Sequence, residues 1–152
     1  MATSTLLQKL DPVADGFGAS TSNRRQVETF LSGGVIGAGD WVQFDSSKTG
    51  SDRVLIAIEA VATFAAGNPL VVGVALDAAT AAGQSIRVVT SGYCEGANVD
   101  NGVAAAGVAL IVDGTGAGIA NALAAGDTAA ACGVSLEAAA GGKCDVWVYS
   151  QF

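Results

Sequence analysis

An internal repeat is the feature of this sequence that most constrains its fold. The segment GVALDAA at residues 73–79 recurs as GVSLEAA at residues 133–139. Two copies are too few for a solenoid, which needs at least three repeats. The repeat therefore predicts two similar halves, at about residues 38–92 and 106–150, that together form one barrel or sandwich.

The alignment of the two copies extends beyond this motif. Upstream, residues 38–45, which begin with Ala-Gly, resemble residues 106–113. Downstream, Ile86 aligns with Val146 and Val88 aligns with Val148. The second copy is shorter, so part of one loop and strand is missing from it.

Alternating polar and apolar residues, separated by glycine-rich turns, indicate β-strands along the chain. The predicted strands are residues 26–30, 41–45, 54–64, 70–76 and 85–90. Residues 107–125 are rich in Ala and Gly, and they fit either a loop or a helical turn at 121–125. The fold class expected is all-β, a small β-barrel or β-sandwich built from a duplicated β unit.

The N-terminal segment differs from the rest of the chain. Residues 1–23 are mostly small and polar, so we expect an extended N-terminal arm preceding a single β domain at residues 24–152. A charged start followed by an apolar block is missing, which argues against a secretory signal and for synthesis in the cytoplasm. The apolar residues 60–76 are too few to cross a membrane and are interrupted by Asn68 and Pro69.

The composition suggests a protein that buries its surface against partners. Charged residues make up 14% of the chain and hydrophobic ones 51%, which leaves few side chains to cover an exposed surface. The net charge of −7 argues against nucleic acid as a partner, because binding phosphates requires clustered Lys and Arg.

Catalytic machinery is hard to assemble from this sequence. The chain has no histidine, which removes the commonest general base and metal ligand. Asp77 and Glu137 stand at equivalent repeat positions, and we interpret them as turn caps rather than as an acid/base pair. The sequence therefore predicts a protein that is not an enzyme and that has no catalytic residue, cofactor or metal site.

The three cysteines carry no metal-binding spacing. An odd number in a chain without a secretory signal suggests reduced thiols, and we expect small buried side chains at Cys94, Cys132 and Cys144. A bond between Cys132 and Cys144 across a hairpin is the alternative.

Several segments resemble proteins of tailed-bacteriophage heads. Residues 25–30 (RQVETF) and the turn at 38–40 are similar to the opening strand and turn of such proteins. The motif at 73–79, followed by Ala-Gly-Gln at 82–84 and a Val-rich strand ending at Gly92, resembles the head decoration, or capsid cement, family. The resemblance covers about residues 24–96, and the Ala- and Gly-rich second half departs from it.

This resemblance implies a structural virion protein on the outer capsid surface. Its partners would be the major capsid protein and further copies of itself, as a homotrimer. The arm would lie across a neighbouring subunit, and the interface residues expected are Phe17, Arg24, Arg25, Trp41 and Trp147. The two tryptophans fit core positions as well as subunit interfaces.

Two other functions remain open at this point. One is a tail or fibre component of a virus particle. The other is a β module that binds a carbohydrate or an ion, because Asp100, Asp113 and Asp127 lie in glycine-containing turns.

Overall fold

The computed structural model describes residues 25–59, 69–112, 116–126 and 128–150. The predicted arm, with Phe17 and Arg24, lies outside these residues. The described residues form strands and a single helical turn: β1 (Arg25–Ser32), β2 (Trp41–Phe44), α2 (Asp52–Leu55), β3 (Ile56–Glu59), β4 (Val71–Ala75), β5 (Ser85–Asn98), β6 (Ala109–Ile111), β7 (Asn121–Ala122), β8 (Gly133–Ser135) and β9 (Lys143–Val148). The all-β prediction is confirmed.

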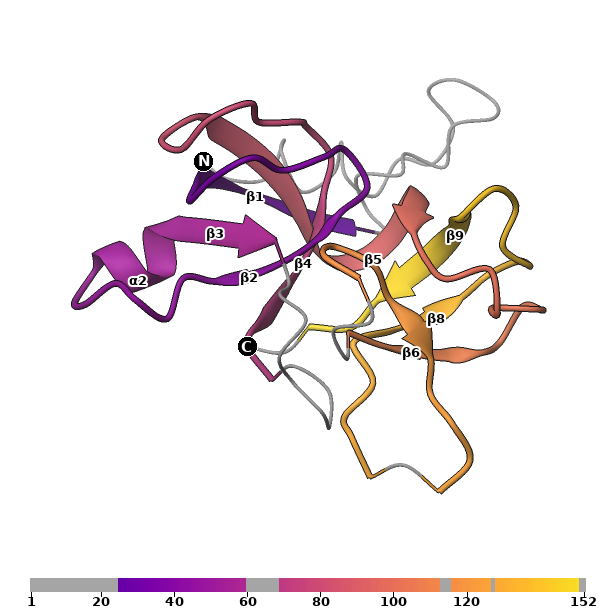
Figure 1. Ribbon diagram of the computed structural model, residues 1–152. Coiled ribbons are helices and arrows are strands. Elements are labelled where there is room, and N and C mark those ends of the chain that lie inside the picture. Colours follow the sequence, from indigo (N-terminus) through magenta and orange to yellow (C-terminus); the bar gives the residue numbers. More distant parts are fainter. Residues whose placement is uncertain (1–24, 60–68, 113–115, 127, 151–152) are drawn as a thin grey trace, which may run out of the picture.

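The first half of the chain closes into a five-stranded barrel. Its strands pair in the order β1-β3-β2-β4-β5, and β5 pairs back with β1. Strands β1 and β3 are parallel, and the remaining pairs are antiparallel. Figure 1 shows this barrel in indigo through magenta to rose, with α2 projecting from one end.

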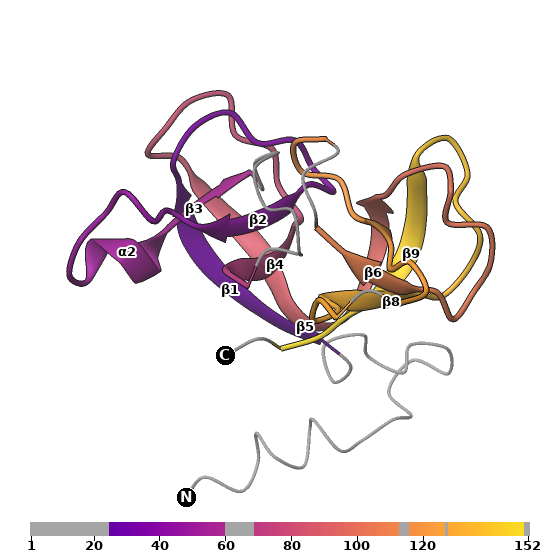
Figure 2. The ribbon, with the colours of Figure 1, turned by 60° about the horizontal axis from the view of Figure 1, so that its bottom comes forward.

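The second half forms a smaller ring of the same kind. Its strands pair in the order β5-β9-β8-β6-β7, and a parallel bridge between Val99 and Ala120 closes the ring. The long strand β5 therefore belongs to both barrels, its first half to one and its second half to the other. Figure 2 shows the two barrels side by side, with β5 joining them.

The hydrogen bonds of the first barrel recur in the second. The N–H of Gly39 donates to the carbonyl of Ala75, and the N–H of Gly107 donates to that of Ser135. The parallel pair Ser32–Ala57 corresponds to the bridge that closes the second ring. The repeated unit is longer than the predicted halves, because β1 has a counterpart in the second half of β5.

The downstream alignment of the repeat was wrong by two residues. Ala75 pairs with Val88, and the corresponding Ser135 pairs with Val146 rather than with Val148. The loop between the paired strands is two residues shorter in the second copy. A shift of two residues keeps each side chain on the same face, so the apolar pattern alone does not reveal it.

Strand β5 runs well beyond its predicted end at Thr90. Gly92 and Gly96, which look like strand ends in the sequence, adopt positive φ angles of 92° and 64° inside the strand. The pairing of β5 with its neighbours is irregular near these glycines; its register with β9 shifts between Cys94 and Ala97. Glycine is the residue that such bulges favour.

Two other segments also differ from expectation. The strand predicted at 54–64 begins later, because residues 52–55 form the helical turn α2; residues 60–64 lie outside the described part. Within the Ala- and Gly-rich residues 107–125, β6 and β7 form paired strands. Neither the loop nor the helical turn expected from the sequence describes these residues.

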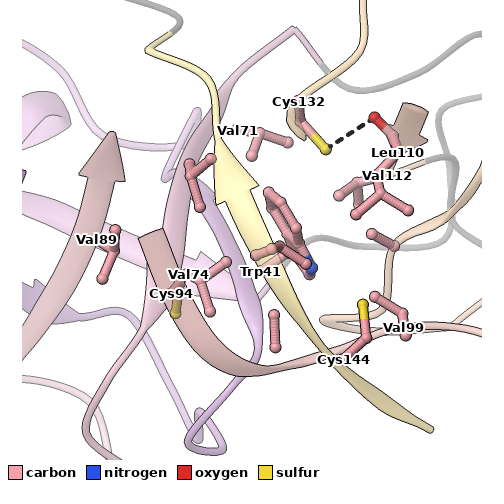
Figure 3. Packing of buried hydrophobic residues seen from close by; sticks show 14 of the residues in the cluster. Trp41, Val71, Val74, Val89, Cys94, Val99, Leu110, Val112, Cys132 and Cys144 are labelled. Atoms are coloured by element: carbon pink, nitrogen blue, oxygen red, sulfur yellow. Dashed lines mark hydrogen bonds between the residues drawn. The ribbon is translucent and has the colours of Figure 1, made fainter. Parts of the chain in front are cut away.

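The second barrel is lined by smaller side chains than the first. Core residues at three corresponding positions change from large to small: Phe30 to Ala97, Phe44 to Val112 and Ile86 to Cys144. Trp41, on β2 of the first barrel, packs among the core residues of the second (Figure 3). Its indole N–H donates to the carbonyl of Asn98, 3.1 Å away, so this one side chain joins the two barrels.

Candidate functional site

The carboxylates at equivalent repeat positions both support turns. Asp77 accepts hydrogen bonds from the backbone N–H and the guanidinium of Arg87, with the closest contact at 2.7 Å. These bonds hold the pKa of Asp77 down, to about 2. Glu137 accepts a bond from the backbone N–H of Asp145. Each carboxylate ties the residue after one strand to the partner strand, which is the role expected for a turn cap.

The cysteines behave as small core residues. Cys94, Cys132 and Cys144 are free and buried. Burial raises the pKa of Cys132 to about 12 and that of the other two to about 11, so the thiols are protonated near neutral pH. A protonated, buried thiol is a poor nucleophile and a poor metal ligand.

A pair of carboxyl groups lies where the two barrels meet. Asp40 is buried and accepts a hydrogen bond of 2.6 Å from the side-chain amide of Asn98. Glu59, at the end of β3, is adjacent to it. Burial of Glu59, together with the Asp40 carboxylate beside it, raises the pKa of Glu59 to about 7.

Replacing Glu59 by Gln is expected to remove a pH-dependent loss of stability. A carboxyl group whose pKa is raised by folding stabilises the native state below its unfolded pKa, near 4.5, and loses that contribution as pH rises through about 7. Wild-type protein should therefore lose stability relative to Glu59→Gln between pH 5 and pH 8. Urea midpoints of both proteins at these two pH values measure the effect, and an unchanged difference would contradict it.

Ligand-binding features are few in the described part of the chain. A pocket of about 100 Å³ lies between strands of the first barrel, next to Glu28, Thr90 and Ser150. It is smaller than the pockets that bind drug-sized ligands, so it does not favour the carbohydrate alternative. Among the described residues, no three His, Cys, Asp or Glu side chains are placed to hold a metal ion.

The described helical residues include no stretch long and apolar enough to cross a membrane.

Each barrel carries a row of apolar side chains across its outer face. In the first barrel, strand register aligns Val27, Val89, Val74 and Trp41 in one row. The second barrel covers three of these four residues: Val89, Val74 and Trp41 have no exposed surface, whereas Val27, at the end of the row, is 38% exposed. The contact between the barrels is therefore built on this row.

The described residues bury the corresponding row on the second barrel only in part. Strand register aligns Tyr93, Trp147, Val134 and Ala109 at the equivalent positions. Trp147 is 39% exposed, and Leu136, two residues beyond Val134 on the same face, is also exposed. We call these five residues the open face.

A second apolar surface lies at the opposite end of the molecule. Leu31 of β1 and the α2 residues Val54 and Leu55 are exposed. Leu31 pairs with Ile56, which directly follows Leu55, so these side chains belong to one edge of the first barrel. We call this the α2 edge; α2 and the second barrel are at opposite ends in both ribbon views (Figures 1 and 2).

The predicted interface residues fall in different environments. Trp41 is fully buried in the core, which is one of the two roles the sequence allowed for it. Trp147 lies on the open face, and Arg25 is half-buried at the start of β1, where it pairs with Gly92. The sequence did not point to Leu31 or Leu55, because an exposed leucine beside a strand has the same pattern as a buried one.

The sequence matches no model of a known protein family and no curated protein.

Proposed function

We propose that this protein is a structural component of a bacteriophage particle that binds the outer capsid surface and cements neighbouring major capsid subunits. In this role it is not an enzyme and works without a cofactor. Its partners are the major capsid protein and further copies of itself, as a homotrimer. It is made in the host cytoplasm and resides on the virion.

The observation that carries this proposal is the pair of apolar faces that the described residues expose at opposite ends of the molecule. A cement protein must contact more than one neighbour at once, whether a capsid subunit or another copy of itself, and the open face and the α2 edge provide two separate contact surfaces. Exposed apolar groups of this kind favour burial against protein partners. A tail or fibre component would use the same two surfaces, so the location in the particle separates these two functions.

Phage particles lacking this protein should assemble and package DNA but lose their DNA at lower temperature than complete particles. Packaged DNA pushes outward on the shell, and a bridge across each subunit boundary opposes separation of the subunits. Bridges that are individually weak act together because they are repeated over the shell. DNA release during a temperature ramp, with and without added purified protein, measures this effect.

A matched control uses the two turn carboxylates. Protein carrying Asp77→Asn and Glu137→Gln should restore the heat resistance of depleted particles nearly as well as wild-type protein, because both groups bond within the chain. Depleted particles that are as heat-resistant as complete ones would refute the cement function. Binding to tails rather than heads would identify the alternative.

A further inference from the structure

We infer that the open face of one molecule binds the α2 edge of a second copy of the same chain, so that copies join head to tail. The inference rests on the proposed function in so far as it names the partner of these two faces. The association itself does not require a capsid.

The two barrels of one chain already make a contact between an outer row and a seam. The second barrel holds Trp41 at two points: Gly118 accepts the backbone N–H of Trp41 at 2.9 Å, and Asn98 accepts its indole N–H at 3.1 Å. Both acceptors lie at the seam where β5 meets β7, next to the Val99–Ala120 bridge. The outer row of the first barrel therefore contacts the second barrel at its seam, the place where the parallel pairing of β5 and β7 closes the ring.

The repeat identifies the equivalent seam on the first barrel. Asn98 pairs with Lys143 as Leu31 pairs with Ser85, so Asn98 corresponds to Leu31. The bridge Val99–Ala120 corresponds to the pair Ser32–Ala57, which makes Gly118 the counterpart of Leu55. The seam of the first barrel is thus the α2 edge, whose apolar side chains are exposed in the described part of the chain.

Side-chain sizes differ between the two ends. Within the chain, Gly118 accepts the backbone N–H of Trp41, and a Cβ on Gly118 would lie 2.7 Å from Asp40, the residue before Trp41, so this position must stay small. At the equivalent positions the open face has the small Ala109 where the first barrel has Trp41, and the α2 edge has the large Leu55 where the second barrel has Gly118. In a contact between two chains, Leu55 rather than a tryptophan would therefore be the large side chain.

The carboxylate next to the open face does not oppose this contact. Asp145 lies beside Trp147 on β9, but both of its carboxylate oxygens accept hydrogen bonds within the chain. One bond comes from the hydroxyl of Tyr93 at 2.7 Å and the other from the N–H of Gly96 at 3.1 Å.

Head-to-tail contacts of this kind close into a ring when the rotation between neighbours allows it, which is compatible with a homotrimer.

Sedimentation of the full-length protein without capsids tests this inference. Wild-type protein should associate as its concentration rises, and Leu55→Asp or Trp147→Glu alone should weaken association at least roughly ten-fold, because each places a charge at the centre of the contact. Leu136→Glu provides a second variant of the open face in case Trp147→Glu is unstable. The control Val35→Asp changes an exposed apolar residue outside both faces and should associate like wild type.

Mixing the two variants separates a head-to-tail contact from a symmetric one. An equimolar mixture of Leu55→Asp and Trp147→Glu retains one intact face and one intact edge, so it should form a dimer that grows no further. The inference is overturned if wild type stays monomeric at all concentrations, if Leu55→Asp associates normally, or if the mixture gives no dimer. Capsid binding is scored separately: binding by a chain that does not self-associate would leave the proposed function standing, whereas self-association without capsid binding would refute only that function.

Discussion

Trp41→Ala is expected to destabilise the protein by about 3–5 kcal/mol, the range for removing a buried large aromatic side chain. The second barrel is lined by small residues, and Trp41 supplies a large part of its core from outside. The ring also reaches across to β8, where a Cβ on Gly133 would lie 3.0 Å from Trp41 Cη2. Calorimetry should show a melting temperature lower by roughly 10 °C.

The same substitution at Trp147 is the matched control. Trp147 keeps 39% of its surface exposed, whereas Trp41 has none, so Trp147→Ala should cost less stability, roughly six-tenths as much on buried area. Equal losses from the two substitutions would mean that Trp41 does not fill the second barrel.

Gly73→Ala is expected to cost about 3 kcal/mol or more, because the added methyl group has no space. A Cβ at this position would overlap the carbonyl oxygen of Val89 and lie 2.8 Å from its carbonyl carbon, both in the backbone of β5. The β4–β5 pairing would have to separate, which opens the first barrel. Urea unfolding followed by circular dichroism measures the loss.

Gly34→Ala provides the comparison for Gly73→Ala. A Cβ on Gly34 would meet no atom within 4 Å, and this glycine has no positive φ. Its replacement should therefore change the free energy of unfolding by less than about 0.5 kcal/mol. If both variants unfold at the same urea concentration, close packing of β4 against β5 is not what requires glycine at position 73.

The repeat made the β architecture predictable, because GVALDAA and GVSLEAA place the same strand and turn in each half. It also led to the correct role for Asp77 and Glu137, since a carboxylate that recurs at a turn is more easily explained by the turn than by catalysis. The limits of β5 were not predictable, because Gly92 and Gly96 have the same sequence signature whether they end a strand or bend it.

The different positions of the two tryptophans could not be predicted from the sequence. Trp41 and Trp147 both lie on strands, and both point outward from their own barrel. Trp41 is buried only because a second barrel covers its row, and that contact depends on residues more than fifty positions away, such as Asn98. Strand periodicity describes one sheet at a time, so it carries no information about which outer face another barrel will cover.

The shared strand β5 has a consequence for how the protein unfolds. Independent domains are usually joined by a linker, and one can melt while the other stays intact. Here a single strand supplies an edge to both barrels, and its detachment breaks the pairing with β1 and β4 on one side and with β9 on the other. The two halves are therefore coupled into one cooperative folding unit, and neither half is a fragment that a protease could release in its native form.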